Sequence, residues 1–263
     1  MFGRYALPGD DLVARLQPTI TASVEDTAYP ATNLMDLNPA KPAKLLTYNG
    51  TFVFDFGTAV NVAAVAIIYH NLDPGLYVVL EWNSSDSWGS PAGSQALTIP
   101  AWSEEPNDGA VSPWVLLPGA PTYQFWRLVT SLGSPDNSLF ISLGRVMFLG
   151  AIRDLENDVR WGVEEIEDHG IIEHTTELGV ETLYALGSKR RRFVGEFALQ
   201  DDKAQELIAL ARSANGRVLS WLLIPDVDVN DAWLVRFQTS GWSRTREAPN
   251  HNLFPFTVQE LSR

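Results

Sequence analysis

The strongest constraint on the fold of this chain is a two-residue period in the side chains of its first half. The segment TFVFDFG, residues 51–57, places Phe at every second position, namely Phe52, Phe54 and Phe56. Successive side chains of a β-strand point to opposite faces, so this spacing predicts a strand with one apolar face. The following segment VNVAAVAIIYHNL, residues 60–72, is almost continuously apolar, which is typical of a strand buried on both faces.

The rest of the first half has the same character. Further strands are predicted in four segments: 75–83, 114–117, 123–132 and 139–150. Two Gly-, Ser- and Pro-rich stretches, 84–95 and 100–122, are predicted to be largely loop, the second with the short strand 114–117 inside it. Residues 1–20 are expected to be an irregular lead-in, and residues 21–44 an ordered loop. This pattern predicts a β-sandwich in residues 1–150.

The second half, residues 151–263, mixes Gly-punctuated strands with one helix. The segment DDKAQELIALARSAN, residues 201–215, begins with Asp201 and Asp202, which favour a helix N-terminus. Apolar residues recur on one helical face, and Asn215-Gly216 is a typical helix stop. The sequence therefore predicts a second domain that is mainly β with a single helix.

The motifs that carry catalysis or bind metals are missing from the sequence. There is no Cys, no G-x-S-x-G motif and no phosphate-binding loop. His169 and His174 are spaced unlike known metal-binding pairs, and the loop 226–231 begins like a calcium loop but has Asp231 and Phe237 where Gly and Glu are needed. We therefore predict a protein that is not an enzyme, with no catalytic residue, no metal and no cofactor.

One basic run and one acidic run predict an interface. Lys189, Arg190, Arg191 and Arg192 form the basic run, whereas the acidic run begins with Glu164 and Glu165. The net charge of −13 argues against nucleic acid as a partner. We expect the basic run to face an acidic run on a neighbouring subunit, and an exposed hairpin tip is the alternative.

Four tryptophans lie in or beside the long loops of the first half. Trp88 and Trp102 are set among Gly, Ser and acidic residues, and we predict that they contact a glycan, with capping of the core as the alternative. Capping of the core is the expected role of Trp82 and Trp114. The N-terminus has no signal-peptide pattern and no segment is long and apolar enough to span a membrane, so we expect a soluble protein made in the cytoplasm.

Several motifs together resemble the discoidin (coagulation factor 5/8 type C) family. They are the pattern S-x-x-D-x-x-Y-P-A-x-N-L-x-D in residues 23–36, the segments FDFG at 54–57 and VAIIYHNL at 65–72, and the segments FWRL at 125–128 and GRVMFLG at 144–150. The resemblance implies a jelly-roll β-sandwich of the galactose-binding type for residues 1–150. The variant wording YPATNL, PAKP and HNL is similar to that of structural proteins of tailed phages. The segment WLLIPDVDVNDAWLVRF after the helix resembles the tube-like β domain of distal tail, hub and minor tail proteins.

This resemblance implies a structural component of a phage tail tip or baseplate, located in the virion and made in the host cytoplasm. The protein would form a homo-oligomeric ring, trimeric or hexameric, with other tail-tip, tube and hub proteins as partners. Its first domain would brace neighbours or touch a host surface glycan. Two alternatives stand beside it: a carbohydrate-binding module without catalytic activity, and a hydrolase of cell-wall polymer that uses a carboxylate such as Glu165.

Overall fold

The computed structural model describes most of the first half of the chain and parts of the second. The described residues are 3–38, 40–74, 76–99, 112–131, 140–155, 164–168, 171–175, 181–185, 190–199, 201–214, 219–224, 232–238, 245–248 and 251–261. The chain divides into two compact units. The first contains Met1–Glu104, Ala110–Asp154 and Leu222–Trp233, and the second contains Glu105–Gly109, Leu155–Trp221 and Leu234–Arg263.

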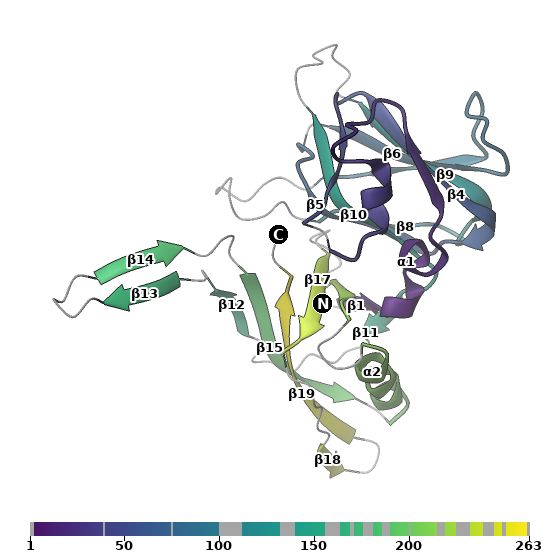
Figure 1. The fold of residues 1–263 in the computed structure, drawn as a ribbon. Helices are drawn as coiled ribbons and strands as arrows, with labels where there is room; N and C mark the ends of the chain where they lie inside the picture. The colour runs from purple at the N-terminus through teal and green to yellow at the C-terminus, as the bar shows by residue number, and fades with distance from the viewer. Residues whose placement is uncertain are drawn as a thin grey trace. The chain divides into compact units, whose positions relative to one another are not determined.

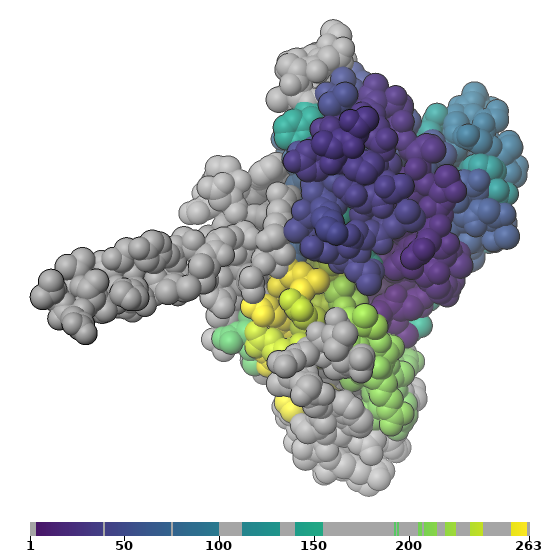
Figure 2. Space-filling view, in the orientation of Figure 1, coloured from purple at the N-terminus to yellow at the C-terminus, as the bar shows by residue number. Residues whose placement is uncertain are grey.

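The first unit contains two antiparallel sheets (Figure 1). The five-stranded sheet has the order β2 (Thr19–Ala22), β4 (Gly50–Asn61), β9 (Thr122–Ser131), β6 (Tyr77–Asn83) and β7 (Gly93–Leu97). The four-stranded sheet has the order β3 (Ala43–Leu45), β10 (Ile141–Leu149), β5 (Ala64–His70) and β8 (Trp114–Leu116). In the space-filling view, the first hundred residues, purple to blue, form one continuous surface (Figure 2).

The inner faces of the two sheets meet in an aromatic core. The ring centroid of Phe148, on β10, lies 4.8 Å from that of Phe54 and 5.7 Å from that of Trp126 on the opposite sheet. Phe52, Phe54 and Phe56 are all buried, as their period-2 spacing predicts. Replacing a core Phe such as Phe148 by Ala typically costs about 3–5 kcal/mol of unfolding free energy. The prediction of a mainly β chain with a β-sandwich in its first half is therefore confirmed.

Strand β5 is buried along both of its faces. Val65 and Ile67 belong to the core between the sheets, while Ala64, Ala66 and Ile68 on the other side are also at most 1% exposed. The nearly continuous apolar segment predicted such a strand.

The lead-in before β2 is regular, so the prediction of irregular structure there was wrong. It contains β1 (Gly3–Ala6), a 3₁₀ turn (η1, Pro8–Asp10) and the short helix α1 (Leu12–Leu16). Strand β1 pairs with β16 (Trp221–Ile224), and β11 (Arg153–Leu155) lies beside β1 in the strand order. These elements are short, and their partners lie far along the chain, so local periodicity did not reveal them.

A buried ion pair fixes α1 to β10. The carboxylate of Asp11 caps the helix by accepting hydrogen bonds from Val13 N at 3.0 Å and Ala14 N at 3.3 Å. It also accepts one from Nη2 of Arg145 at 2.5 Å, and both side chains are buried. Burial raises the pKa of Asp11, and the neighbouring Arg145 guanidinium opposes that rise.

The loop predicted at 84–95 ends earlier than expected, because β7 begins at Gly93. A Cβ atom at this position would lie 2.6 Å from the ring of Trp82, so only glycine fits beside the indole. Trp82 packs on Trp126, with ring centroids 5.5 Å apart, and lies against the core. Trp114 is also buried, which confirms the core role predicted for these two tryptophans.

The described part of the second unit is built around two long strands. Strand β19 (His251–Glu260) pairs with β15 (Arg190–Leu199), and the two run side by side in Figure 1. β17 (Trp233–Phe237) and β18 (Thr245–Ala248) also pair with β19, whereas β12 (Glu164–Asp168) pairs with β15. Strands β13 (Ile171–Thr175) and β14 (Glu181–Ala185) form a separate two-stranded sheet.

The helix α2 (Asp201–Ser213) accompanies these strands, close to the predicted range 201–215. Among the described residues, no helix is both long enough and apolar enough to cross a membrane. The division of the chain into domains 1–150 and 151–263 stays a prediction.

Candidate functional site

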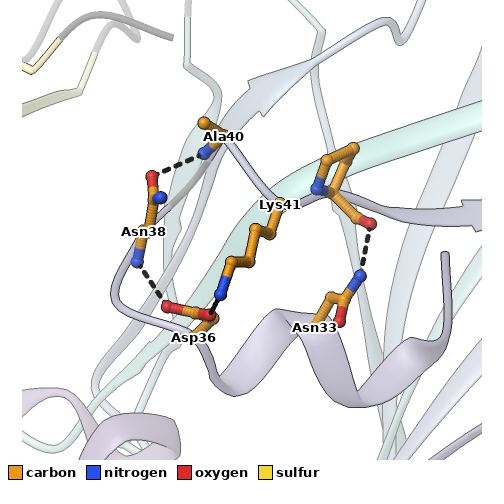
Figure 3. A network of polar contacts seen from close by, with 6 residues as sticks. Asn33, Asp36, Asn38, Ala40 and Lys41 are labelled. Carbon is orange, nitrogen blue, oxygen red and sulfur yellow. Dashed lines mark hydrogen bonds and ion pairs between the residues drawn. The ribbon is translucent and has the colours of Figure 1, made fainter.

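The motif loop between the 3₁₀ turn η2 (Ala31–Met35) and β3 is held together by its own polar side chains (Figure 3). Asn33 Nδ2 donates to Pro42 O at 3.0 Å. One carboxylate oxygen of Asp36 accepts from Asn38 N at 2.9 Å, and the other pairs with Lys41 Nζ at 2.9 Å. These bonds, that of Asn38 N first, lower the pKa of Asp36. The polar residues of the motif therefore shape the loop.

The same motif fixes the position of Tyr29. The carboxylate of Glu25 accepts from Ala31 N, and Tyr29 N donates to Asp26 O at 2.8 Å. Lys44 N then donates to Tyr29 O at 2.9 Å, which attaches this turn to strand β3. Hydrogen bonds therefore hold both the N–H and the carbonyl group of Tyr29 in place.

Asn71, in the HNL segment after β5, holds the residue that precedes β10. Its Nδ2 donates to Phe140 O at 2.8 Å, and its Oδ1 accepts from Ser142 N at 2.6 Å. His70 is buried, and its Nδ1 accepts from Leu72 N at 3.0 Å, which shapes the turn. The HNL segment therefore fixes the backbone of Phe140.

These two anchored segments meet at Lys44. Its Nζ lies 3.5 Å from the ring centroid of Tyr29 and 5.2 Å from that of Phe140. The Tyr29 residue is 38% exposed and Phe140 is 49% exposed. We call Tyr29, Lys44 and Phe140 the aromatic–lysine site. Lys44 pairs with Ser142 in the β3–β10 register, which brings this lysine close to Phe140.

A second cluster of an aromatic ring and a cation lies on the outer face of the five-stranded sheet. Arg127 Nε and Nη2 donate to one carboxylate oxygen of Glu81 at 2.8 and 2.5 Å. The indole of Trp88 reaches back from the β6–β7 loop, 4.5 Å from Arg127 Cζ, and its Nε1 donates to Asp86 at 2.6 Å. We call Trp88, Arg127, Glu81 and Asp86 the Trp88 cluster. Here the indole covers an ion pair and secures the loop.

The other residues predicted to form sites fall partly outside the described part of the chain. Four of these predicted features lie outside the described residues, namely Trp102, Lys189, His169 and the loop 226–231. Phe237, the last position of the calcium-like pattern, lies at the end of β17. No group of three or more His, Asp or Glu side chains gathers as a metal site within the described ranges. Glycan contact by Trp88 and Trp102 stays a prediction, as does a catalytic role of Glu165.

The acidic and basic runs lie on neighbouring strands of one chain. The β12–β15 register places Glu165 opposite Phe193, Glu167 opposite Arg191 and Asp168 opposite Arg190. The register therefore brings the backbone of the acidic run next to that of the basic run within one chain. The interface predicted for Glu164, Glu165 and Arg190–Arg192 with another subunit stays a prediction.

Sequence reasoning missed Lys44 and Phe140 as site residues. The period-2 phase contained a signal, because Ala43, Leu45 and Ile141 are buried in the core and the residues between or beside them must point outward. What the sequence did not reveal is that β3 pairs with β10, which brings Lys44 to Phe140.

No protein-family model matches the chain, and no curated protein matches it either. Three of the similar solved structures are sugar-binding modules. A mutant of chitosan-binding module 1 from a chitosanase/glucanase of Paenibacillus sp. IK-5 has a TM-score of 0.39 and 18% identity, covering 53% of this chain and 98% of the module. A fucose-binding module of Streptococcus pneumoniae has a TM-score of 0.40 and 10% identity, and the match covers 52% of this chain and 96% of the module. The family 32 carbohydrate-binding module of C. perfringens NanJ, in complex with galactose, has a TM-score of 0.39 and 14% identity. That match covers 57% of this chain and 99% of the module. The fold is defined by the strand order of the chain itself.

Proposed function

We propose that the first unit is a carbohydrate-binding domain and that the aromatic–lysine site contacts the sugar. The observation that carries this proposal is a pair of exposed aromatic rings, Tyr29 and Phe140, that both contact one ammonium group. Sugars present apolar C–H faces, which stack on aromatic rings, and hydroxyl groups, which need hydrogen-bond donors and acceptors. The site supplies both kinds of contact.

The site is also ordered before any ligand arrives. Asn71 fixes the backbone of Phe140, and the turn at Asp26 fixes that of Tyr29. A ligand that binds a pre-organised site spends less free energy on ordering side chains and loops. This matters for a small sugar, which buries little surface.

Isothermal titration calorimetry, guided by a glycan array, tests the proposal. We expect the intact chain to bind at least one class of glycan, and Phe140→Ala to weaken binding by about thirtyfold, as the loss of a central aromatic contact does. Leu116→Ala is the matched control, because Leu116 is exposed on β8, at the opposite edge of the same sheet. A glycan that binds equally well to Phe140→Ala would contradict the proposed site.

A second function, the phage-tail structural component, is favoured by one feature of the second unit. Strands β13 and β14 pair only with each other among the described strands. An isolated two-stranded sheet is marginally stable in water, so a neighbouring subunit would stabilise it. This supports contact with another subunit. In the proposed phage-tail component, the subunits would form a homo-oligomeric ring in a virion, with tail-tip, tube and hub proteins as the other partners.

Size-exclusion chromatography with light scattering tests this second function. A ring predicts a trimer or a hexamer at micromolar concentration, and antibodies against the chain should label one end of phage tails. A monomer that no phage particle contains would contradict it. Sugar binding by the first unit is compatible with either outcome.

A further inference from the structure

We infer that the aromatic–lysine site selects sugars that carry a carboxylate, with Lys44 Nζ as the group that binds it. This inference rests on the proposed carbohydrate binding and names the class of sugar. It starts from the way in which the basic side chains of the first unit are partnered.

Five basic side chains described in the first unit are paired with a carboxylate. The pairs are Arg4–Asp154, Lys41–Asp36, Arg127–Glu81, Arg145–Asp11 and Arg153–Asp10. Arg15 donates instead to Gly9 O. The side chain of Lys44 differs from all of them, because within the described part of the chain it contacts two aromatic rings instead of a carboxylate.

Three acidic residues in the motif segment that precedes Lys44 have partners other than this lysine. Asp26 accepts from Ala28 N at 3.0 Å, and Glu25 accepts from Ala31 N. Asp36 is paired with Lys41. Within the described residues, none of these carboxylates forms an ion pair with Lys44.

A ring contact leaves an ammonium group able to bind an anion. A lysine ammonium has three N–H donors, and an aromatic ring interacts with the side of the cation that faces it. The remaining donors point away from the Tyr29 ring. Lys44 Nζ also lies over the Phe140 ring, at 5.2 Å from its centroid, so the opposite face of that ring is the one a sugar can stack on. A pyranose stacked on that face would bring an exocyclic carboxylate past the ring edge towards the ammonium.

The charge of the whole chain opposes this selection, which makes the test sharper. The net charge of −13 repels anions in general. A preference for an acidic sugar over a neutral sugar of the same shape must therefore come from a local cation. Lys41 provides the matched control, since it is a nearby lysine already neutralised by Asp36.

The experiment titrates the full chain with trigalacturonic acid, trimannuronic acid and the methyl ester of each, which removes the charge and keeps the sugar. A neutral glycan array is run beside it. We expect one acid to bind about tenfold more tightly than its ester, as a charge-assisted hydrogen bond would give. Lys44→Gln should abolish this ratio, Lys44→Arg should retain most of it, and Lys41→Gln should leave it unchanged. Melting curves identify any variant that fails to fold, and Lys44→Arg then carries the test.

The outcomes separate this inference from the proposed function. If neutral sugars bind and no acid is preferred, or if the preference survives Lys44→Gln, the inference is overturned while carbohydrate binding stands. If no sugar of either kind binds to the intact chain, carbohydrate binding itself fails, and the inference fails with it.

Discussion

The Trp88 cluster and the aromatic–lysine site have the same ingredients and opposite arrangements. Arg127 is bonded to Glu81 and covered by Trp88, and the Arg127 and Glu81 side chains are 20% and 18% exposed. Lys44 has no carboxylate partner among the described residues, and its two aromatic neighbours are 38% and 49% exposed. An aromatic ring beside a cation is thus not a binding site in itself. Two properties distinguish a structural contact from a ligand site: whether the cation is already paired with a carboxylate, and how far the ring is exposed.

The difference also separates stability from binding. The Trp88 cluster is internally satisfied, so changes there should destabilise the sandwich without affecting a ligand at the other cluster. The aromatic–lysine site contributes less to stability, because Tyr29 and Phe140 are more exposed than Trp88 and no ion pair joins them. Single substitutions and a pH titration test this separation, in order of decreasing effect on the free energy of unfolding.

Glu81→Ala should cause the largest loss. It leaves the Arg127 guanidinium partly buried with no carboxylate, which typically costs about 1–3 kcal/mol. Urea unfolding followed by tryptophan fluorescence measures the loss. Lys44→Ala is the counterpart, with an expected cost below about 1 kcal/mol, because it removes cation–π contacts with two exposed rings and no ion pair. Equal losses in the two variants would remove the distinction between the clusters.

Asn71→Ala should affect both stability and binding. Its side chain makes two hydrogen bonds, to Phe140 O and from Ser142 N, each worth about 0.5–1.5 kcal/mol. Losing them frees the backbone of Phe140, so we expect a weaker sugar affinity together with a lower unfolding free energy. Calorimetric titration and urea unfolding are run on the same variant. An unchanged affinity would show that Phe140 does not need this anchor.

Trp88→Ala should cost about 1 kcal/mol, the upper range for a cation–π contact at a partly exposed position, and should leave sugar affinity unchanged. Proteolysis of the β6–β7 loop offers a second measurement, because the loop loses the hydrogen bond to Asp86. A drop in sugar affinity in this variant would instead support the glycan contact predicted from the sequence.

The smallest effect concerns pH. The pKa of Asp36 is lowered below its ordinary value of 3.8, chiefly by the hydrogen bond from Asn38 N and then by Lys41. Its contribution to stability is therefore present above pH 3.8 and is lost as the pH falls through the lower folded pKa. We expect the amide signals of Asp36, Asn38, Ala40 and Lys41 to shift in that range in an NMR titration. The shifts should vanish in Asp36→Asn, and their persistence there would assign them to another group.

The sequence predicted the elements whose signal is local. The Phe52, Phe54 and Phe56 alternation identified β4, and the acidic start of α2 identified the helix. Helix α1 was missed because it is short and depends on a contact that is distant in the sequence. Its capping residue, Asp11, is held by Arg145. The aromatic–lysine site was missed for the same reason. Tyr29 and Asn71 belong to the recognised motifs, but their relation to Lys44 and Phe140 depends on long-range strand pairing.

The most direct test compares sugar binding in Phe140→Ala and Trp88→Ala by titration calorimetry against the best ligand of the intact chain. Each variant removes one aromatic ring that contacts a cation. The two variants therefore differ only in which of the two clusters is changed. We predict that Phe140→Ala loses about thirtyfold in affinity, whereas Trp88→Ala retains that of the intact chain. The reverse result, with affinity lost in Trp88→Ala and kept in Phe140→Ala, would contradict the assignment of the binding site.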